Sequence, residues 1–194
     1  PTSTLLNMLE PLNPFMEANP IGDFDDLAEG MVSTFSSDGV LYVVPVRSNP
    51  QILHYNKAIF ADRGITRAPL TFEELVEDAR KTTYTRADGA RVYGLGLKPR
   101  EDIIAVVRAF GGEVLTSDYE VLCSEPLAVE AITILRDLYA EGVIPPNFTV
   151  LGSKDYQSLV GEGLVVMTFF GDNYYLRFND PAKSRDNSCR QKTS

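Results

Sequence analysis

The sequence contains a single histidine, His54, and its surroundings are the first test of a catalytic function. A Ser-His-Asp or Cys-His arrangement would depend on this one imidazole. His54 alternates with apolar residues in a strand-like run, which is more typical of a hydrogen-bonded structural histidine. The chain has no H-E-x-x-H, phosphate-loop or G-x-G-x-x-G motif. The sequence therefore predicts a protein that is not an enzyme.

Adjacent carboxylates occur at Asp25-Asp26 and Glu73-Glu74, which raises the question of a glycosidase pair. Glu74 lies three residues after Thr71, the spacing of a helix capping box. We interpret Asp25-Asp26 as solvated loop charge. No catalytic pair of carboxylates, metal site or cofactor site is predicted.

Polar and aromatic side chains gather at the ends of predicted elements, as they do in non-covalent binding sites. Two precede a strand, two open a helix whose N-terminal amides favour an acceptor or anion, and three follow an apolar strand that ends at Gly171. Each group also has an ordinary explanation, as a solvated turn, first-turn helix charge or tyrosine packing. The candidate ligand-binding residues are Arg47, Asn49, Arg100, Glu101, Asp172, Asn173 and Tyr174.

The elements that would position these residues alternate between strand and helix. β-Branched, aromatic and apolar runs predict strands, and three/four spacing, capping signals and terminal glycines predict helices. Because two of the strands are apolar on both faces, we expect a mixed or parallel sheet covered by helices. The predicted strands are 40–46, 51–55, 90–97 and 164–170, and the main predicted helices begin near residues 58, 71, 100, 124 and 153.

Composition excludes several classes of protein. Of 194 residues, 44% are apolar and 23% charged, which is an ordinary globular balance. The net charge is −9 and no Lys/Arg cluster is present, so a nucleic-acid partner is not expected. No run approaches the ~20 apolar residues that span a bilayer. The two cysteines, Cys123 and Cys189, predict neither a disulfide framework nor a zinc site.

The order of these segments resembles one protein family. A Gly-x-x-Tyr-x-x-Pro strand precedes a strand that ends Tyr-Asn-Lys, and a Pro-x-Thr-x-x-Glu helix start and a Gly-x-Gly-x-x-x-Met segment follow. The residues concerned are Gly39, Tyr42, Pro45, Tyr55, Asn56, Lys57, Phe60, Gly64, Pro69, Thr71, Glu74, Gly161, Gly163, Met167 and Gly171. The pattern is similar to that of extracellular solute-binding proteins of bacterial ABC importers, the family that includes maltose-binding protein.

This resemblance implies a type II periplasmic-binding-protein-like α/β fold, in which two lobes close around a ligand. It also implies that the chain holds mostly the second lobe, with the hinge strands and the end of lobe one. The joint before the strand at 51–55 would then lie at the cleft floor, and the turn after Gly171 would face the ligand. The implied divisions are 1–46 (end of lobe one), 47–57 (hinge crossing), 58–180 (lobe two) and 181–194 (disordered tail).

The chain departs from the family pattern in two ways. Sugar binders of this class commonly stack a pyranose on a tryptophan after the final glycine, but this chain has no tryptophan and places Asn173 there. Stacking must then come from Tyr174, Tyr175 or Phe170, which favours a small sugar, a polyol or an anionic solute over a long oligosaccharide. The family also has a longer N-terminal part and a return segment, so we expect this chain to correspond to a middle portion.

The resemblance therefore predicts the substrate-binding component of an ABC transporter, which captures a carbohydrate or similar polar solute for uptake. Its partners would be that small solute and a membrane permease, and its location periplasmic or extracellular, with lipid anchoring of the full-length parent as one form. Three alternatives stay open at this point. They are a ligand-sensing, chemoreceptor-linked protein of the same fold, an enzyme that uses His54 on a two-lobe scaffold, and a truncated module that self-associates.

Overall fold

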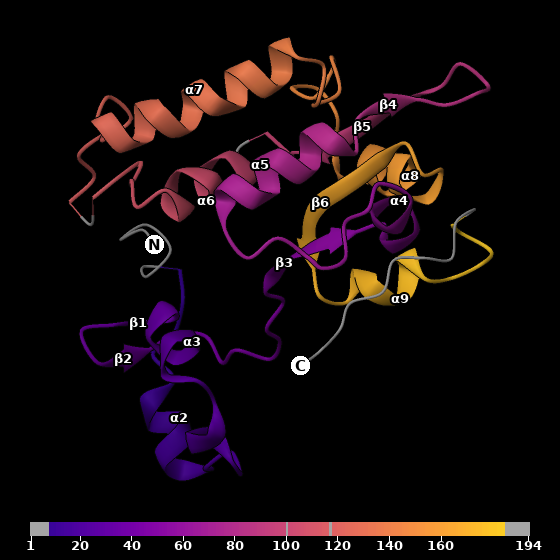
Figure 1. The fold of residues 1–194 in the computed structure, drawn as a ribbon. Coiled ribbons are helices and arrows are strands. Elements are labelled where there is room, and N and C mark those ends of the chain that lie inside the picture. Colours follow the sequence, from indigo (N-terminus) through magenta and orange to yellow (C-terminus); the bar gives the residue numbers. More distant parts are fainter. Residues whose placement is uncertain (1–7, 100, 117, 185–194) are drawn as a thin grey trace. The chain divides into compact units, whose positions relative to one another are not determined.

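The computed structural model describes residues 8–99, 101–116 and 118–184 (Figure 1). The chain divides into two compact units, Pro1–Asn49 and Pro50–Ser194. The boundary between them falls inside the segment 47–57 that the sequence predicts as a hinge crossing, and its role as a hinge stays a prediction. Within the described ranges, no helix has both the length and the apolar character needed to cross a membrane.

The described part of the first unit, residues 8–49, holds short elements only. Its hairpin consists of two strands of two residues each. The Asn13 side chain holds this hairpin against α2, since Asn13 Oδ1 accepts a hydrogen bond from the Leu41 backbone N–H at 2.8 Å. The predicted strand 40–46 is wrong beyond Leu41, since in the described part of this unit no further strand is present for residues 42–46 to pair with. The elements are α2 (Asn13–Ala18), η1 (Phe24–Asp26), α3 (Glu29–Thr34), β1 (Ser36–Ser37) and β2 (Val40–Leu41).

A four-stranded mixed sheet forms the centre of the second unit, in the order β3-β6-β5-β4. β6 runs parallel to β5 and antiparallel to β3, and β4 is antiparallel to β5. The prediction of a mixed sheet is confirmed. The strands are β3 (Gln51–Tyr55), β4 (Tyr84–Thr85), β5 (Arg91–Gly96) and β6 (Val165–Gly171).

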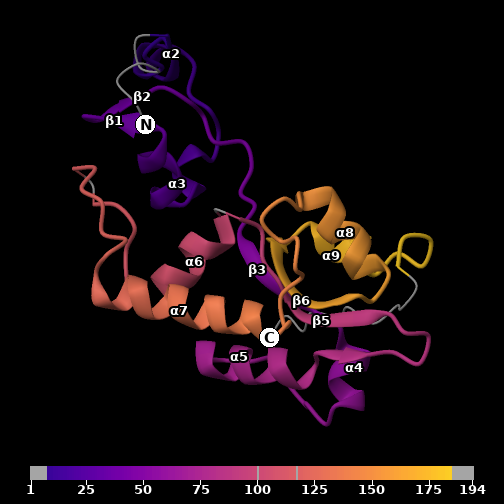
Figure 2. The ribbon, with the colours of Figure 1, turned by 90° about the horizontal axis from the view of Figure 1, so that it is seen from above.

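Helices cover both faces of this sheet. In Figures 1 and 2, α5, α6 and α7 lie on one side of β5 and β6, and α8 and α9 lie on the other. Each side buries its own apolar cluster, centred on Leu95 and Leu138 on the first side and on Tyr156 and Phe178 on the second. The helices are α4 (Lys57–Asp62), α5 (Phe72–Lys81), α6 (Glu101–Ala109), α7 (Pro126–Ala140), α8 (Ser153–Gly161) and α9 (Tyr174–Phe178).

Asn56 explains why an apolar strand stops on a polar pair and restarts as a helix. Its backbone N–H continues the sheet by donating to the Val166 carbonyl at 2.9 Å. Its side-chain Oδ1 then accepts from the backbone N–H groups of Ala58 and Ile59, both at 3.1 Å, and so caps α4. Asn56 is buried, so water does not replace these bonds.

A glycine allows a helix to pack directly on the sheet. A Cβ atom at Gly94 would lie 1.9 Å from the Ala79 carbonyl oxygen of α5, so no larger residue fits there. The Gly94 N–H donates to Thr83 Oγ1 at 2.9 Å, and that hydroxyl donates to the Ala79 carbonyl at 2.7 Å. Gly94 is therefore the point at which the backbone of α5 approaches the sheet most closely among these contacts.

A buried ion pair joins the end of β5 to the start of α6 and the end of β6. Lys98 Nζ lies 2.8 Å from both carboxylate oxygens of Asp102, and the two side chains are 8% and 2% exposed. The Lys98 backbone N–H also donates to Asp102 at 2.7 Å. The ammonium group donates in addition to the Phe169 carbonyl and lies 4.5 Å from the Phe170 ring centre. Three chain segments are thus fixed at one point.

The start of α5 agrees with the sequence expectation, and the end of the second unit does not. Thr71 caps α5 as predicted, with Oγ1 accepting from the Glu74 N–H at 3.2 Å. Leu70, which directly precedes this cap, is 79% exposed, whereas Leu75 inside the helix is buried. At the other end of the unit Ser184 is buried, so described structure continues beyond residue 181, where a disordered tail was expected to begin. The rest of that tail, 185–194, lies outside the described residues.

Replacing Asn56 by Ala tests the importance of a buried cap. We expect Asn56→Ala to lower the free energy of unfolding by about 2 kcal/mol, because a buried backbone N–H loses its acceptor. Thr71→Ala is the matched change at an exposed cap and should cost about 1 kcal/mol or less. Urea unfolding of both variants measures the difference, and equal losses would contradict this account.

The ion pair predicts a non-additive double variant. Lys98→Met leaves the Asp102 carboxylate buried without its counter-charge, so we expect a loss of about 3–5 kcal/mol of unfolding free energy. Adding Asp102→Asn should recover part of that loss, because the amide oxygen still accepts from the backbone N–H of residue 98 and needs no cation.

Lys81→Met is the control for this series. Lys81 pairs with Glu77 at the same i,i+4 spacing, but its side chain is half exposed, so unfolding should not change measurably. The comparison is made by urea unfolding. A double variant whose loss equals the sum of the two single losses would show that the two side chains do not act as a pair.

Candidate functional site

The candidate site lies at one edge of the sheet in the second unit, where three chain segments meet. β5 and β6 are parallel, so both end at this edge. β3 is antiparallel to β6, and its first residue, Gln51, pairs with Gly171, the last residue of β6. The Asp172 backbone N–H then donates to the Pro50 carbonyl at 3.1 Å. Side chains that follow β5 and β6 therefore share the edge at which ligands bind in α/β sheets.

Glu101 is held at this edge by its neighbour. It is the first residue of α6, and its side chain is exposed. The next residue, Asp102, is buried in the ion pair with Lys98, so the first turn of α6 is fixed relative to β5. Burial raises the pKa of Asp102, and the hydrogen bonds from Lys98 act in the opposite direction. Arg100, the other residue predicted here, lies outside the described residues.

The turn after β6 presents two further polar side chains. Asp172 and Asn173 are both exposed, and Asn173 precedes α9 without capping it through its side chain. Tyr174 is half-buried and packs its ring 4.8 Å from that of Phe170. Its hydroxyl accepts from Gln157 Nε2 at 3.4 Å. Asp172 and Asn173 are thus free to meet a ligand, whereas Tyr174 also contributes to packing.

Arg47 and Asn49 belong to the first unit. Both are exposed and lie in a stretch, 42–50, that is neither helix nor strand. Asn49 directly precedes Pro50, whose carbonyl accepts from Asp172. The structure therefore brings Glu101, Asp172 and the two residues after it to one sheet edge, and the place of Arg47 and Asn49 at a cleft floor stays a prediction.

The single histidine supports this edge from within the second unit. His54 is 5% exposed, and its Nε2 lies 3.1 Å from the Gly171 carbonyl oxygen. Its ring also meets the Phe178 ring edge-on, with centres 5.1 Å apart. Burial lowers the pKa of His54 below its ordinary value of 6.5, although the Gly171 carbonyl acts in the opposite direction. His54 therefore holds the turn that carries Asp172 and is not displayed to solvent.

The sequence analysis did not identify two residues that position the candidate site. Lys98 and Asp102 lie on either side of Arg100 and Glu101, which were read as helix-start charges. Their i,i+4 spacing was a possible signal, but the third partner, the Phe169 carbonyl, lies 71 residues away in the chain. Only the folded sheet brings that oxygen to Lys98.

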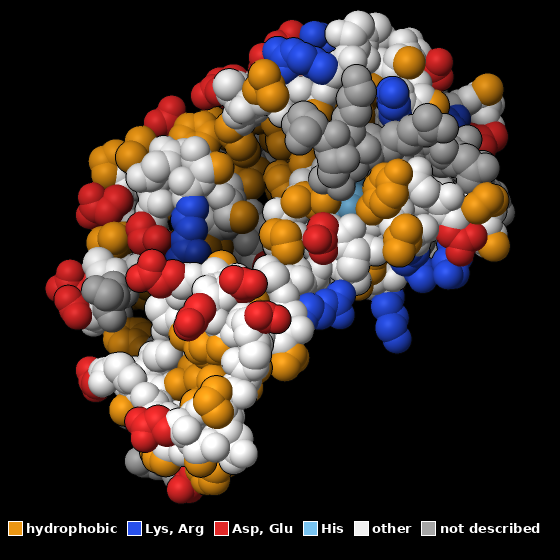
Figure 3. All heavy atoms as spheres, turned by 90° about the horizontal axis from the view of Figure 1, so that it is seen from below, with side chains coloured by type: hydrophobic (Ala, Val, Ile, Leu, Met, Phe, Trp, Pro, Cys, Tyr) orange, Lys and Arg blue, Asp and Glu red, His pale blue; other side chains and the backbone are white. Residues whose placement is uncertain are grey.

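The surface and the charged clusters restrict the ligand chemistry. Among the described residues, no group of three His, Cys, Asp or Glu side chains is arranged to hold a metal ion. On the face shown in Figure 3, Lys and Arg side chains lie in separate small groups with acidic side chains between them. Among the described residues of this face, the Lys and Arg side chains do not form one continuous patch (Figure 3).

Comparison with known proteins gives a relative by sequence. A protein of Brucella abortus (strain 2308), named as a binding protein, is 31% identical over 163 residues. The match covers 81% of this chain and 38% of the relative.

Solved structures show the same fold. Maltose-bound T. maritima MalE3 matches with a TM-score of 0.74 and 26% identity, over 89% of this chain and 44% of that protein. An ABC transporter solute-binding protein from Agrobacterium radiobacter K84, solved with ribitol, matches with a TM-score of 0.80 and 21% identity, over 94% and 47%. The predicted type II periplasmic-binding-protein-like fold is thereby confirmed, and the chain spans less than half the length of each protein.

The family model for bacterial extracellular solute-binding proteins matches residues 4–187. This range covers most of both units and every residue of the candidate sheet edge. The chain therefore belongs to the bacterial extracellular solute-binding protein family.

Proposed function

We propose that this chain is part of the substrate-binding component of an ABC transporter, which captures a carbohydrate or similar polar solute for uptake. The observation that carries the proposal is the single sheet edge that presents Glu101, Asp172 and Asn173 beside the start of β3. Structural relatives with bound maltose, ribitol and D-mannitol support the choice of solute. The membrane permease of such a transporter is the proposed partner.

The second unit is the proposed second lobe. In this assignment residues 1–46 end lobe one, 47–57 form the crossing, 58–180 form lobe two, and the cleft lies against the edge described above. A unit boundary at Asn49/Pro50 supports this division. Arg47 and Asn49 would then reach the solute from the crossing, and Arg100 and Glu101 from the start of α6.

The exposed side chains at the edge suit a solute rich in hydroxyl groups. Carboxylates of Glu101 and Asp172 accept hydrogen bonds, and the amide of Asn173 both donates and accepts. With no tryptophan in the chain, ring stacking is limited to tyrosine and phenylalanine, and Tyr174 is half-buried. A small sugar or polyol, bound mainly by hydrogen bonds, fits this set best.

Binding without chemical conversion is part of the proposal. The one imidazole of the sequence is buried and directed at a backbone carbonyl, so it is poorly placed to act as a general base on a bound solute. Family membership supports a periplasmic or extracellular location, and lipid anchoring of the whole protein is an additional proposal.

A ligand screen tests the function on the longest natural protein that contains this sequence. Sugars, polyols and phosphorylated solutes are tested by thermal shift, and a hit at roughly a hundred times its Kd should stabilise the fold by about 2.7 kcal/mol. For the best solute, Glu101→Gln and Asp172→Asn should each weaken binding at least about tenfold in calorimetry, because a charged acceptor is lost.

Glu130→Gln is the matched control for these variants. Glu130 is an exposed carboxylate on α7, on a helix that does not end at the candidate edge, and its replacement should leave Kd unchanged. Equal affinity in Glu101→Gln, Asp172→Asn and the control would remove this edge from the binding site.

His54→Gln separates a binding protein from an enzyme and has a defined pH dependence. The variant should retain solute binding, because glutamine Nε2 can donate to the Gly171 carbonyl.

Since the folded pKa of His54 lies below 6.5, the unfolded chain takes up its proton first as the pH falls, so His54 lowers stability below that value. The stability of wild type relative to His54→Gln should therefore fall between about pH 7 and 5, as urea unfolding measures. Turnover of a sugar substrate that disappears in a folded, binding-competent variant would support the enzyme alternative.

A further inference from the structure

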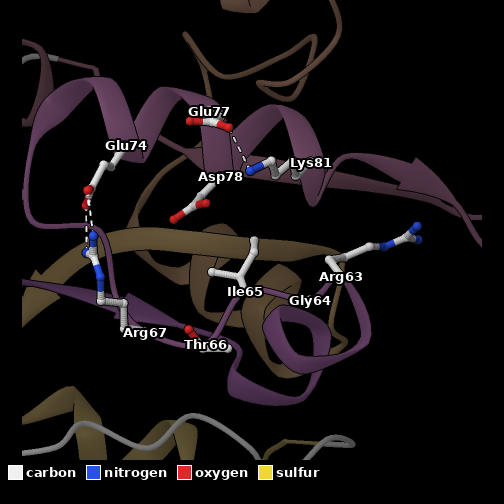
Figure 4. Close-up of a pocket in the computed structure, with 9 residues that line it drawn as sticks. All are labelled: Arg63, Gly64, Ile65, Thr66, Arg67, Glu74, Glu77, Asp78 and Lys81. Atoms are coloured by element: carbon white, nitrogen blue, oxygen red, sulfur yellow. Dashed lines mark hydrogen bonds and ion pairs between the residues drawn. The ribbon is translucent and has the colours of Figure 1, made fainter.

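A polar cavity lies between α5 and the loop that follows α4. It has a volume of about 250 Å³ and is lined by residues 63–67 of the loop and by Glu74, Glu77, Asp78 and Lys81 of α5 (Figure 4). The space is large enough for several water molecules or for a small organic molecule. None of the candidate ligand-binding residues lines it, so it is separate from the sheet edge described above.

Most charged groups around this cavity already have partners. Arg67 makes a two-point ion pair with Glu74, at 2.6 and 2.7 Å, and Glu74 also accepts from the Leu70 N–H. Lys81 Nζ lies 2.7 Å from Glu77. The Arg63 guanidinium lies 3.9 Å from the Tyr84 ring centre and points away from the cavity in Figure 4.

Asp78 is the exception. It is 9% exposed, and Figure 4 shows its carboxylate directed from α5 into the space above Ile65 and Thr66. Among the described residues, no hydrogen bond or ion pair engages this carboxylate. The residue is largely covered, but its carboxylate faces the cavity, where water or a ligand can reach it.

The electrostatic surroundings indicate which ligand this carboxylate would attract. Burial is the largest influence and raises the pKa of Asp78, Lys81 acts in the opposite direction, and the charge of Glu77 raises it further. An anion would add repulsion to these carboxylates. The described residues contain no cluster suited to a metal ion. A ligand that carries one positive charge and several N–H donors meets the need.

We propose that this cavity binds a small protonated amine, whose ammonium group donates to the Asp78 carboxylate. An alkyl chain of a few carbons would lie over Ile65, and the Thr66 hydroxyl, on the same wall, is available to accept a further N–H. The site is independent of the proposed solute site, so either can fail without the other.

The test uses n-butylamine and 1,4-diaminobutane on the 194-residue chain, at constant ionic strength. At roughly five times its Kd, an amine should raise the melting temperature by about 2–4 °C. Asp78→Asn should abolish the shift and, without amine, be at least as stable as wild type. Glu73→Gln, which neutralises an exposed carboxylate of the same helix outside the cavity, should respond like wild type. 1-Butanol, which matches n-butylamine in length without the charge, should have no effect.

Backbone NMR gives a second measurement that does not depend on a variant folding. Titration of wild type with n-butylamine should shift the amide signals of residues 63–67 and of Asp78. A blocked Gly-Lys-Gly peptide distinguishes a free amine from a lysine side chain of a partner protein. The proposal is overturned by equal melting shifts in wild type and Asp78→Asn, by no response to either amine, or by a response to the peptide alone.

Discussion

The geometry of the candidate edge depends on one buried ammonium group. Removing the charges of Lys98 and Asp102 from water costs several kcal/mol for each ion, and only close pairing with further hydrogen bonds offsets that cost. Here the pair is two-pointed, and the Phe169 carbonyl and Phe170 ring complete the surroundings of the ammonium group. Because those partners come from β5, α6 and β6, none of the three segments can shift alone. Glu101 and Asp172 are exposed, yet each lies within three residues of this fixed point.

The direction of β3 gives the edge its second property. An antiparallel strand beside β6 must begin where β6 ends, so the chain reaches this unit at the same edge that presents Glu101 and Asp172. The bond from Asp172 to the Pro50 carbonyl ties the incoming segment to the turn. Under the proposed function, a lobe movement that bends residues 47–50 acts directly on the turn that holds the solute. The hinge and the site are then coupled by this one contact, without a longer chain of contacts between them.

The sequence predicted elements well where a signal is local. Asn56 and Thr71 are caps that act within three residues, and the glycines that end α4 and α6 have positive φ, so the positions of these helices were readable. Failures occurred where the outcome depends on a distant partner. Residues 42–46 have strand composition but no strand beside them in the described unit. The sequence did not predict the structural role of Lys98, because its acceptor, the Phe169 carbonyl, is distant in the sequence. At the site, the sequence grouped Glu101 with a helix start and Asp172 with the end of a strand, but only the parallel pairing of β5 and β6 shows that both residues lie at one sheet edge.

The side chains of β3 and of the residue after it make contacts that depend on the register of the strand. Gln51 pairs with Gly171, the His54 side chain holds the Gly171 carbonyl, the Tyr55 ring packs 4.6 Å from that of Phe60, and Asn56 caps α4. Successive side chains of a strand point to opposite faces, so a shift of one residue would move every one of them to the wrong side. The imidazole would leave the turn, and the cap would no longer meet the first amides of α4. Strand register therefore links the start of the helical layer to the turn that carries Asp172.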